Sequence, residues 1–517
     1  MFSKSSYDFS IDTKSSFSYI HFAMSWNTMK PFWIWAALFG LLFAVLFCVR
    51  LGLFNNLNSG QKIVSLASVD LRPEKDSWMN IFQNGRKIGS SHTHFSKTAA
   101  GYHLKENVYM RINTMGLIQD IHLDTGGKLN PDFTLSSFDF EISSSRFRFQ
   151  AKGSISGDVL SIQTQSFGSK RKIDIRIKER IYIVPGILKA AAALRLEPDQ
   201  EFAFQVFDPV TLGSETVVVK VVGQEEISSM GLNKTAKKLS LTFKGLTQLA
   251  WVGENGEVLK EKGFLGISLE KTTRQDALFG LPVEASQDLT TVASVPSNML
   301  IGDAAKLTGL EVQIEGITYE NVYLHGGRQS FYNNVLTIKK ESLAGLPTFP
   351  DMNTRLGAEK EYLEPTPFVQ SDHPKIRKLA RQIASRDQDP LEKVAKLVDW
   401  IHRNIEKRPV LSLPDALSTL ENRMGDCNEH AVLLAALARA AGIPAKIEAG
   451  LVYLNGRFYY HAWNLLYLGR WVTADALFGQ IPADVTHIRF SSGHQKQQLD
   501  LMNIIGKIKL KIVKQTK

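Results

Sequence analysis

Residues 425–444 read GDCNEHAVLLAALARAAGIP, and this stretch decides the fold of the C-terminal part of the chain. Asp426 is a favourable helix N-cap, and Glu429 follows at the spacing of a capping box. The run after it is apolar on every side, so the predicted helix is buried rather than amphipathic. Gly442 and then Pro444 end the helix in the expected order.

The chain has two cysteines, Cys48 and Cys427, so no disulfide framework is available. Cys427 falls in the first turn of the predicted helix, where unpaired N–H groups and the positive end of the helix dipole favour a thiolate. The alternative is that Cys427 is a small buried hydrophobe, the usual environment of a free cysteine. Its position at a helix start favours a nucleophile.

A predicted hairpin follows the helix. Phe458–Leu466 and Arg470–Asp475 have the character of strands, and Tyr467–Gly469 forms the turn between them. Folding the hairpin at this turn places His461 directly opposite Asp475 on one side of the sheet. Opposed Cβ atoms lie roughly 5 Å apart, so the carboxylate can hold the imidazole in one tautomer.

Four segments in this region occur in a characteristic order. They are Asp426–His430, Ala441–Ala445, Tyr460–Trp463 and Trp471–Asp475. Together they resemble the core of the transglutaminase-like, papain-related superfamily, in which a helix cysteine, a strand histidine and a strand aspartate follow one another. The tail Phe478–Gln480 with Ala483–Ile488 resembles a bacterial, membrane-anchored envelope branch of it, in which a proline stands at the position of Ala476.

This resemblance, which covers about a quarter of the chain, implies an α+β catalytic domain. By position, Cys427 is the nucleophile, His461 is the base and Asp475 orients the histidine. The resemblance implies no cofactor, and since no calcium-binding loop is evident we predict no metal requirement.

Other side chains near these segments have competing interpretations. His430 could join Cys427, His461 and Asp475 around a metal, but structural zinc sites mostly use more cysteines, so we expect a core or supporting histidine. Trp463 and Trp471 share the histidine's face of the hairpin and are expected to pack in the core rather than stack on substrate. Gln480 could line the cleft. The Cys427 N–H is the one oxyanion donor that the geometry suggests.

The formal net charge of the 517-residue chain is +10. Five lysines and no acidic residue lie between Gly506 and Lys517, so half of the excess charge is in the tail. This pattern is not that of a nucleic-acid surface. A solvated end is the simple interpretation, but Ile508, Leu510 and Ile512 alternate with lysines as in a protected edge strand, and attraction to anionic lipid is a third alternative.

Phe32–Val49 is an uncharged apolar run of 18 residues with Trp33 and Trp35 at one end. As a helix it spans about 27 Å, near the hydrocarbon thickness. Phe47 and its neighbours are too large for a signal-peptidase site or for lipidation of Cys48, so we predict an uncleaved signal anchor. We expect a single-pass protein of the bacterial inner membrane, with the N-terminus in the cytoplasm and the bulk of the chain in the periplasm.

Alternation of apolar and polar residues and turn signals such as Asn84-Gly85 and Asn255-Gly256 predict an extended antiparallel sheet between the anchor and the helical region. The predicted segments are an N-terminal tail (1–30), a transmembrane anchor (31–50), a tether (51–75), an antiparallel β portion (76–345, with a division near 225–295 left open), a proline-rich linker (346–370), a transglutaminase-like domain (371–490) and a basic C-terminal tail (491–517).

Two functions fit these features. The first is a membrane-anchored thiol enzyme that acts on amide bonds of a peptide or protein substrate by hydrolysis or acyl transfer. The second is a non-catalytic, membrane-anchored binding or scaffold protein that uses the β portion. No motif indicates a nucleic-acid partner, and the sequence leaves the oligomeric state open.

Overall fold

The structure is a computed structural model that describes residues 75–145, 147–166, 169–193, 198, 200–209, 212–243, 246–283, 285, 287–319, 322–346, 357–384, 389–409, 414–493 and 504–517. The predicted tail (1–30), anchor (31–50) and most of the tether (51–75) lie outside these residues. Among the described residues, no helix has the length and apolar character needed to cross a membrane.

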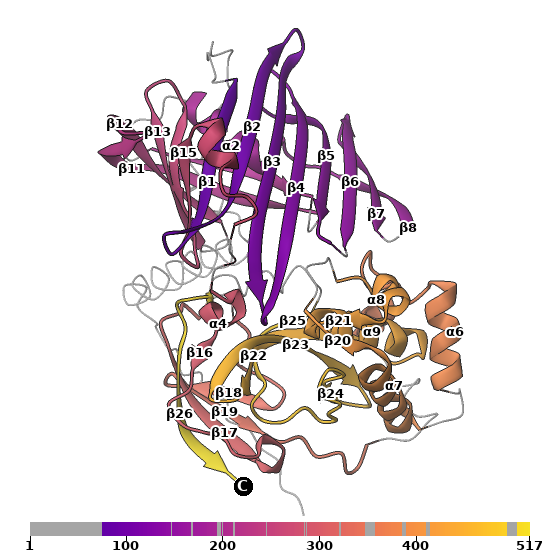
Figure 1. The fold of residues 1–517 in the computed structure, drawn as a ribbon. Helices are drawn as coiled ribbons and strands as arrows, with labels where there is room; N and C mark the ends of the chain where they lie inside the picture. The colour runs from indigo at the N-terminus through magenta and orange to yellow at the C-terminus, as the bar shows by residue number, and fades with distance from the viewer. Residues whose placement is uncertain are drawn as a thin grey trace, which may run out of the picture. The chain divides into compact units, whose positions relative to one another are not determined.

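The N-terminal portion is a single antiparallel sheet with one parallel edge pair, and its fifteen strands follow the order β8-β7-β6-β5-β4-β3-β2-β1-β15-β14-β13-β12-β11-β10-β9 (Figure 1). The strands are β1 (Asp76–Gln83), β2 (Arg86–Thr98), β3 (Gly101–Thr114), β4 (Leu117–Leu129), β5 (Leu135–Ser143), β6 (Arg148–Ser156), β7 (Val159–Ser166), β8 (Ser169–Arg176), β9 (Ile181–Ile183), β10 (Glu201–Asp208), β11 (Gly213–Ser229), β12 (Leu232–Phe243), β13 (Leu246–Gly253), β14 (Val258–Lys262) and β15 (Ile267–Thr272). The predicted extended antiparallel sheet is thereby confirmed.

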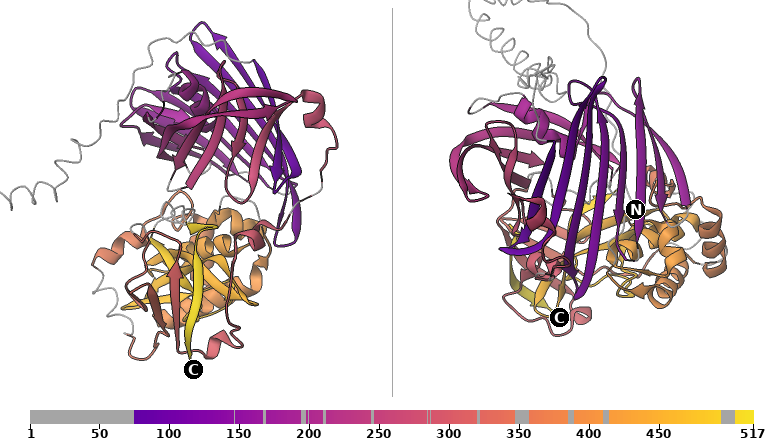
Figure 2. Two further views of the ribbon diagram at one scale, coloured as in Figure 1. Left: turned by 90° about the vertical axis from the view of Figure 1, so that its left-hand side faces the viewer. Right: turned by 45° about the horizontal axis from the view of Figure 1, so that its top comes forward.

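This sheet is strongly curved (Figure 2). One apolar cluster draws residues from β2 to β7 and also from β9 to β13, so the two halves of the sheet share a core. The helix α2 (Val184–Ala193) contacts β3, β9 and β10 and places Ile187 and Ala190 in that cluster. The predicted turn Asn84-Gly85 between β1 and β2 has a left-handed φ at both residues, as a type I′ turn requires. In the predicted turn Asn255-Gly256 between β13 and β14, the glycine has a left-handed φ.

Residues after β15 leave the large sheet. The short helices α3 (Arg274–Leu278) and α4 (Leu289–Ala293) begin at the N-caps Thr273 and Asp288. The strands β17 (Gly309–Glu315), β18 (Gln329–Tyr332) and β19 (Val335–Lys339) then form a separate four-stranded sheet with β26 (Lys509–Thr516), in the order β18-β19-β17-β26. Two 3₁₀ helices lie at Ala304–Lys306 and Ala358–Leu363.

The C-terminal basic stretch is therefore an edge strand for most of its length rather than a solvated end. Leu510 and Ile512 are buried, and the lysines that alternate with them face outward. The partner β17 lies about 200 residues earlier in the chain. Lysines on an exposed strand edge discourage pairing with a further chain.

The helices α6 (Pro374–Ile383), α7 (Pro390–Asn404), α8 (Ala416–Asn422) and α9 (Cys427–Ala440) lie in the chain between the first strand and the other strands of an antiparallel sheet. Its strands are β16 (Val295–Pro296), β22 (Ala445–Leu454), β23 (Arg457–Tyr467), β24 (Trp471–Ala474) and β25 (Ile488–Gly493), and a separate short parallel pair is formed by β20 (Glu406–Lys407) and β21 (Met424–Gly425). The central helix α9 packs against α6, α7, α8, β22 and β23. The predicted buried helix at 427–440 is confirmed, since nearly all of its residues have little exposure.

Candidate active site

Cys427 is the first residue of α9, and its local structure follows from the capping residues around it. The Asp426 carboxylate accepts the Asn428 N–H at 2.8 Å, and the Glu429 carboxylate accepts the Asp426 N–H at 3.0 Å. This is the predicted capping box, and it fixes the first turn of the helix. The chain therefore presents the Cys427 side chain at the N-terminal end of a helix that is buried along its whole length.

The surroundings of the Cys427 thiol oppose a resting thiolate. Cys427 is 8% exposed. Burial, and after it the charge of Asp426, raises the pKa of the thiol well above its usual value, whereas a hydrogen bond from the backbone N–H of Ala462 lowers it. The helix-terminal effect that predicts a thiolate is thus outweighed, because the capping carboxylates place negative charge beside the same helix end. We infer that the resting form is the neutral thiol.

The hydrogen bond from Ala462 to the sulfur brings the start of α9 to β23 immediately after His461. The strand has a gap in its pairing there: on one edge β16 pairs with Arg457 and Phe458, and β24 pairs from Asn464 onward. Among the described residues, no strand pairs with Tyr459–Trp463 on that edge. The fold therefore brings the cysteine and histidine segments together where the sheet is open.

His461 and Asp475 are in direct contact, as predicted. The His461 Nε2 atom lies 2.6 Å from Asp475 Oδ2, and both side chains are almost fully buried. The predicted register is wrong, however. Asn464 pairs with Ala474, so continuing that register places Asp475 opposite Trp463, two residues further along β23 than His461. The contact is a diagonal one, which long side chains on one face can span.

The turn after Asp475 forms without the proline that the envelope branch has there. Asp475 and Gln480 exchange two backbone hydrogen bonds of 2.9 Å, and Asp475 Oδ1 accepts the Phe478 N–H at 3.0 Å. Ala476 is buried inside this turn, and Gly479 adopts a left-handed φ of 69°. Gly479 is needed for a second reason, since a Cβ there would lie 3.0 Å from the His402 ring.

A second histidine, for which the sequence predicts no role, bonds to the same carboxylate. His487 Nε2 lies 2.9 Å from Asp475 Oδ2, and His487 Nδ1 lies 3.3 Å from Asp484 Oδ1. Burial alone would raise the pKa of Asp475, but His461 and His487 hold it far below its usual value. The only signal in the sequence is the stretch Ala483–Ile488, which carries a resemblance but no spacing from which this contact follows.

His430 does not join this group. Its Nδ1 lies 2.7 Å from the Asp426 carbonyl oxygen, so Nδ1 carries the proton, and its buried Nε2 has no hydrogen-bond partner among the described residues. Burial lowers the pKa of His430, which favours the neutral ring. These observations agree with the predicted supporting histidine.

The ligand atoms of His461, Asp475 and His487 lie within 4.8 Å of one another, which is the one grouping among the described residues that could hold a metal ion by distance. The distances of 2.6 and 2.9 Å are those of charge-assisted hydrogen bonds with a proton in each. The arrangement is explained by protons, and we assign no metal to it.

Two further side chains have supporting positions. Trp463 is 1% exposed and donates from Nε1 to Glu448 Oε2 at 2.9 Å, which agrees with the predicted core role. The Gln480 side chain bonds to Asp484 twice, through its amide nitrogen and its carbonyl oxygen, each at 3.0 Å. Gln480 thus braces the loop that carries Asp484.

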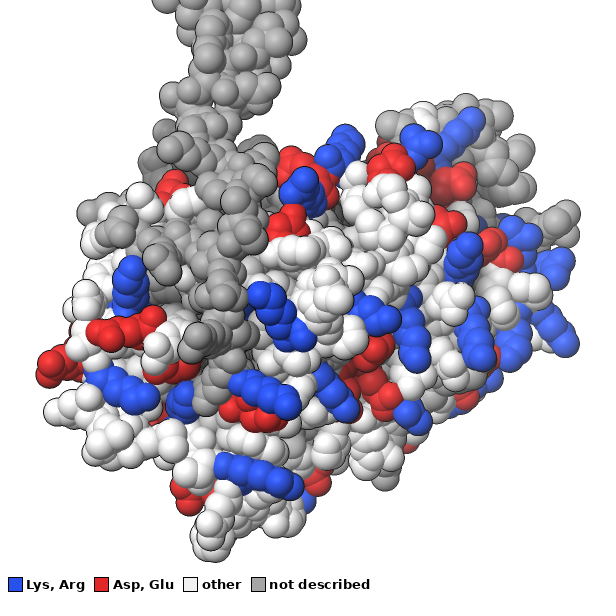
Figure 3. Space-filling view, turned by 90° about the horizontal axis from the view of Figure 1, so that it is seen from above, with Lys and Arg blue, Asp and Glu red and all other residues white. Residues whose placement is uncertain are grey.

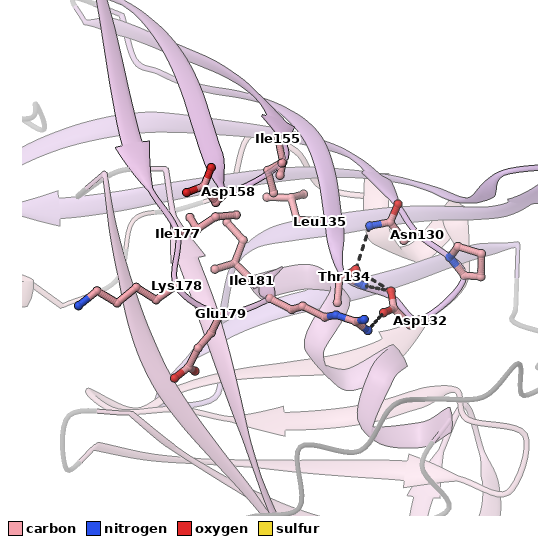
Figure 4. A pocket seen from close by; sticks show the side chains of 13 residues that line it. Asn130, Asp132, Thr134, Leu135, Ile155, Asp158, Ile177, Lys178, Glu179 and Ile181 are labelled. Carbon is pink, nitrogen blue, oxygen red and sulfur yellow. Dashed lines mark hydrogen bonds and ion pairs between the residues drawn. The ribbon is translucent and has the colours of Figure 1, made fainter.

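The large sheet has a pocket of its own, of about 710 Å³, between the ends of β4, β6 and β9 (Figure 4). An Arg180–Asp132 ion pair of 2.7 Å and the apolar side chains of Leu135, Ile155 and Ile177 line it. None of the candidate catalytic residues contributes to it. On the face seen from above, basic and acidic side chains are interspersed rather than separated by sign (Figure 3).

Comparison with known proteins identifies the class of the C-terminal region. Residues 377–476 match the model of the transglutaminase-like superfamily, so the chain contains a transglutaminase-like domain region that includes Cys427, His461 and Asp475. No curated protein matches the chain.

Three solved structures are similar to parts of the chain. A candidate cysteine protease from Cytophaga hutchinsonii has 22% identity and a TM-score of 0.27, and the match covers 39% of this chain and 83% of that one. The periplasmic domain of TgpA from Pseudomonas aeruginosa has 17% identity and a TM-score of 0.23, over 33% and 70% of the two chains. A β-barrel-like protein of unknown function from Brucella abortus has 8% identity and a TM-score of 0.30, over 38% and 94%. These similarities are low and identify no activity for this chain.

Proposed function

We propose that the protein is a cysteine-dependent enzyme that acts on amide bonds of peptides or proteins through Cys427, His461 and Asp475. The observation that carries the proposal is the 2.6 Å contact between His461 Nε2 and Asp475 Oδ2. It leaves His461 Nδ1 as the ring nitrogen available to the thiol. The hydrogen bond from the Ala462 N–H to the Cys427 sulfur supports the same arrangement, because it brings the sulfur to the residue after His461.

In this mechanism the thiol proton passes to His461 Nδ1 as the sulfur attacks the carbonyl carbon, and the C=O electron pair moves to the oxygen. In this proposal the Cys427 N–H at the helix start is the donor that stabilises that oxyanion. His461 then returns the proton to the departing amine or ammonia as the C–N bond breaks. Water resolves the acyl-enzyme in an amidase or protease, and a second amine resolves it in a transglutaminase.

We further propose that the apolar run at 31–50 anchors the enzyme in the inner membrane, with the described domains in the periplasm. The sequence of that run supports the anchor. Protease protection of intact and permeabilised spheroplasts tests the orientation: the bulk of the chain is expected to be digested in intact spheroplasts.

The test of the enzyme uses the full chain with Cys48→Ser, so that Cys427 is its single thiol. Alkylation of Cys427 by iodoacetamide is followed between pH 5 and pH 10, with and without His461→Ala. We expect a rate component that depends on His461. If Cys427 reacts no faster than a free thiol at pH 6 and His461→Ala changes nothing, the enzyme proposal fails and the alternative, a non-catalytic binding or scaffold protein that uses the β portion, replaces it.

A further inference from the structure

One carboxylate oxygen in this site accepts two imidazoles. Asp475 Oδ2 lies 2.6 Å from His461 Nε2 and 2.9 Å from His487 Nε2, and Asp475 Oδ1 accepts the Phe478 N–H. Asp475 is 1% exposed and His487 is fully buried. A pairing of one aspartate with one histidine is enough to orient a catalytic imidazole, so the second histidine needs an explanation.

The second nitrogen of His487 also faces acceptors. His487 Nδ1 lies 3.2 Å from the Asp484 backbone oxygen and 3.3 Å from its Oδ1 atom. A carbonyl oxygen has no proton to donate, and an ionised carboxylate has none either, so both ring nitrogens must carry hydrogen. Burial lowers the pKa of His487, but the hydrogen bonds that its ring donates to Asp475 and Asp484 raise it above its ordinary value overall. The geometry thus holds His487 as an imidazolium.

The positive charges of Arg328 and Arg489 do not take the place of the His487 imidazolium. Arg328 donates to the backbone carbonyl oxygens of Ala483 and His487 and lies 3.6 Å from Glu341. In addition, Arg489 pairs with the carboxylate of Glu448 at 3.2 Å. Each of these guanidinium groups has its own acidic partner. The rings that pack on His487 are His461, Trp463 and Phe478, of which only His461 titrates.

We infer that His487 is a positioning residue for the proposed triad: its buried imidazolium fixes the Asp475 carboxylate and offsets its charge, so that His461 meets the thiol as a neutral base. This inference rests on the proposed function. An uncompensated carboxylate favours the charged form of its histidine and hence an imidazolium–thiolate pair at rest. The positive charge of His487 on the same Asp475 oxygen weakens this preference for the ion pair.

The consequence is a neutral resting pair of thiol and imidazole. The same conclusion follows independently from the environment of Cys427, where burial and the carboxylates of the helix cap disfavour the thiolate. The thiol proton then moves to His461 only as the S–C bond forms, and the imidazolium of His461 is stabilised by Asp475 in the transition state rather than before it. Interactions that strengthen in the transition state are the ones that raise the catalytic rate.

The experiment compares full-length chains that all carry Cys48→Ser. His487→Gln keeps an N–H donor of similar reach toward Asp475 but removes the positive charge. We expect its Cys427 to react with iodoacetamide about tenfold faster at pH 6 than the parent, because loss of the positive charge beside Asp475 favours the imidazolium–thiolate pair. The matched control is His402→Gln, another histidine that contacts the same loop through the Leu477 carbonyl oxygen, and its profile is expected to match that of the parent.

A second measurement does not depend on any variant folding. Full-length chain labelled with ¹⁵N-histidine is examined for downfield ring N–H signals, which are assigned by their proximity to the Trp463 and Phe478 rings that pack on His487. Two His487 N–H signals are expected from pH 6 to pH 8, whereas a single one means a neutral ring and overturns the inference. An unchanged pH–alkylation profile for a folded His487→Gln chain overturns it as well. If His461→Ala leaves the parent's profile unaltered, it is the proposed function that fails, and the two outcomes are thus distinct.

Discussion

Asn464 connects α9, which carries Cys427, to β23, which carries His461. The side chain is fully buried, and its Nδ2 atom donates to the Ala431 carbonyl oxygen at 2.9 Å and to the Lys446 carbonyl oxygen at 3.4 Å. Its Oδ1 atom has no hydrogen-bond partner among the described residues. The position therefore combines useful hydrogen bonds with a desolvation cost, and these two effects can be separated by substitution.

In Asn464→Leu, the side-chain volume is nearly kept while the amide is removed. Loss of one good and one long hydrogen bond costs about 1.5 kcal/mol, and removal of the unpaired buried oxygen returns about 1–3 kcal/mol. The free energy of unfolding should therefore change by less than about 1.5 kcal/mol. Reactivity is expected to respond more strongly, because a displacement of α9 by about 1 Å can cost as much as 100-fold in rate.

The assay pairs urea denaturation with the His461-dependent rate of Cys427 alkylation in the Cys48→Ser chain. Asn464→Ala serves as the comparison, since it also leaves a cavity and should lower stability by about 2–4 kcal/mol. A Leu variant that keeps both the parent's stability and its alkylation profile would show that Asn464 does not set the geometry between α9 and β23. A loss of stability equal to that of the Ala variant would refute the assigned cost of the unpaired oxygen.

Three further predictions concern other parts of the fold. Glu448→Ala is expected to destabilise the protein by about 3–5 kcal/mol in urea denaturation, and Glu448→Gln by less, because the Ala change leaves Arg489 buried without its carboxylate; equal effects would contradict this. Burial raises the pKa of Glu261 to about 7 from an ordinary 4.5, and Glu106 beside it shifts in the same way. The folded state binds the extra proton, so stability is lost as pH rises from about 4.5 through 7. Glu261→Gln should therefore be more stable than the parent by about 1–2 kcal/mol at pH 8 but not at pH 4. Thermal melts at these two pH values measure the difference. Ile512→Ala should cost about 2–4 kcal/mol, since Ile512 is 1% exposed within the four-stranded sheet; a solvated C-terminal end would give no change in the melting temperature.

Local chemistry made the start of α9 predictable, whereas the completed site depends on distant packing. Asp426 and Glu429 lie three residues apart, so their capping box is visible in the sequence and is present in the structure. The contact between His461 and Asp475 also follows from one hairpin, although its register does not. Tyr467 pairs with Trp471, and this closes the hairpin one residue later than the turn signal indicates. Because His461 and Trp463 lie on the same face of β23, the error in register did not affect the predicted contact between His461 and Asp475.

His487 could not be placed from the sequence, because its position depends on the loop that runs from Asp475 through Gln480 and back. That loop is closed by backbone pairing between Asp475 and Gln480 and by the Gln480–Asp484 bonds. No periodicity in the sequence predicts these contacts. The pairing of β26 with β17 could not be predicted for the same reason, since two strands separated by about 200 residues carry no local signal for each other. The sequence indicates that a strand is present near Leu510, and only the tertiary fold supplies its partner.

The contacts of the site loop predict how the transglutaminase-like region behaves in isolation. Thr473, two residues before Asp475, donates from its backbone N–H to Glu341 at 3.1 Å, and Arg328 donates to the carbonyl oxygens of Ala483 and His487. These braces come from residues well before the matched region.

An apolar cluster joins the same segments: Leu310, Val312 and Ile338 of the four-stranded sheet pack with Leu451, Phe458, Ile488 and Phe490. A fragment cut at 371 and 490 would expose one side of that cluster, and large exposed apolar patches promote association. We therefore expect fragment 371–490 to aggregate or to unfold without cooperativity, whereas fragment 288–517 should show a cooperative urea transition and His461-dependent alkylation. Should the shorter fragment retain both properties, the braces from Arg328 and Glu341 are dispensable, and the geometry of the site is set within the transglutaminase-like region alone.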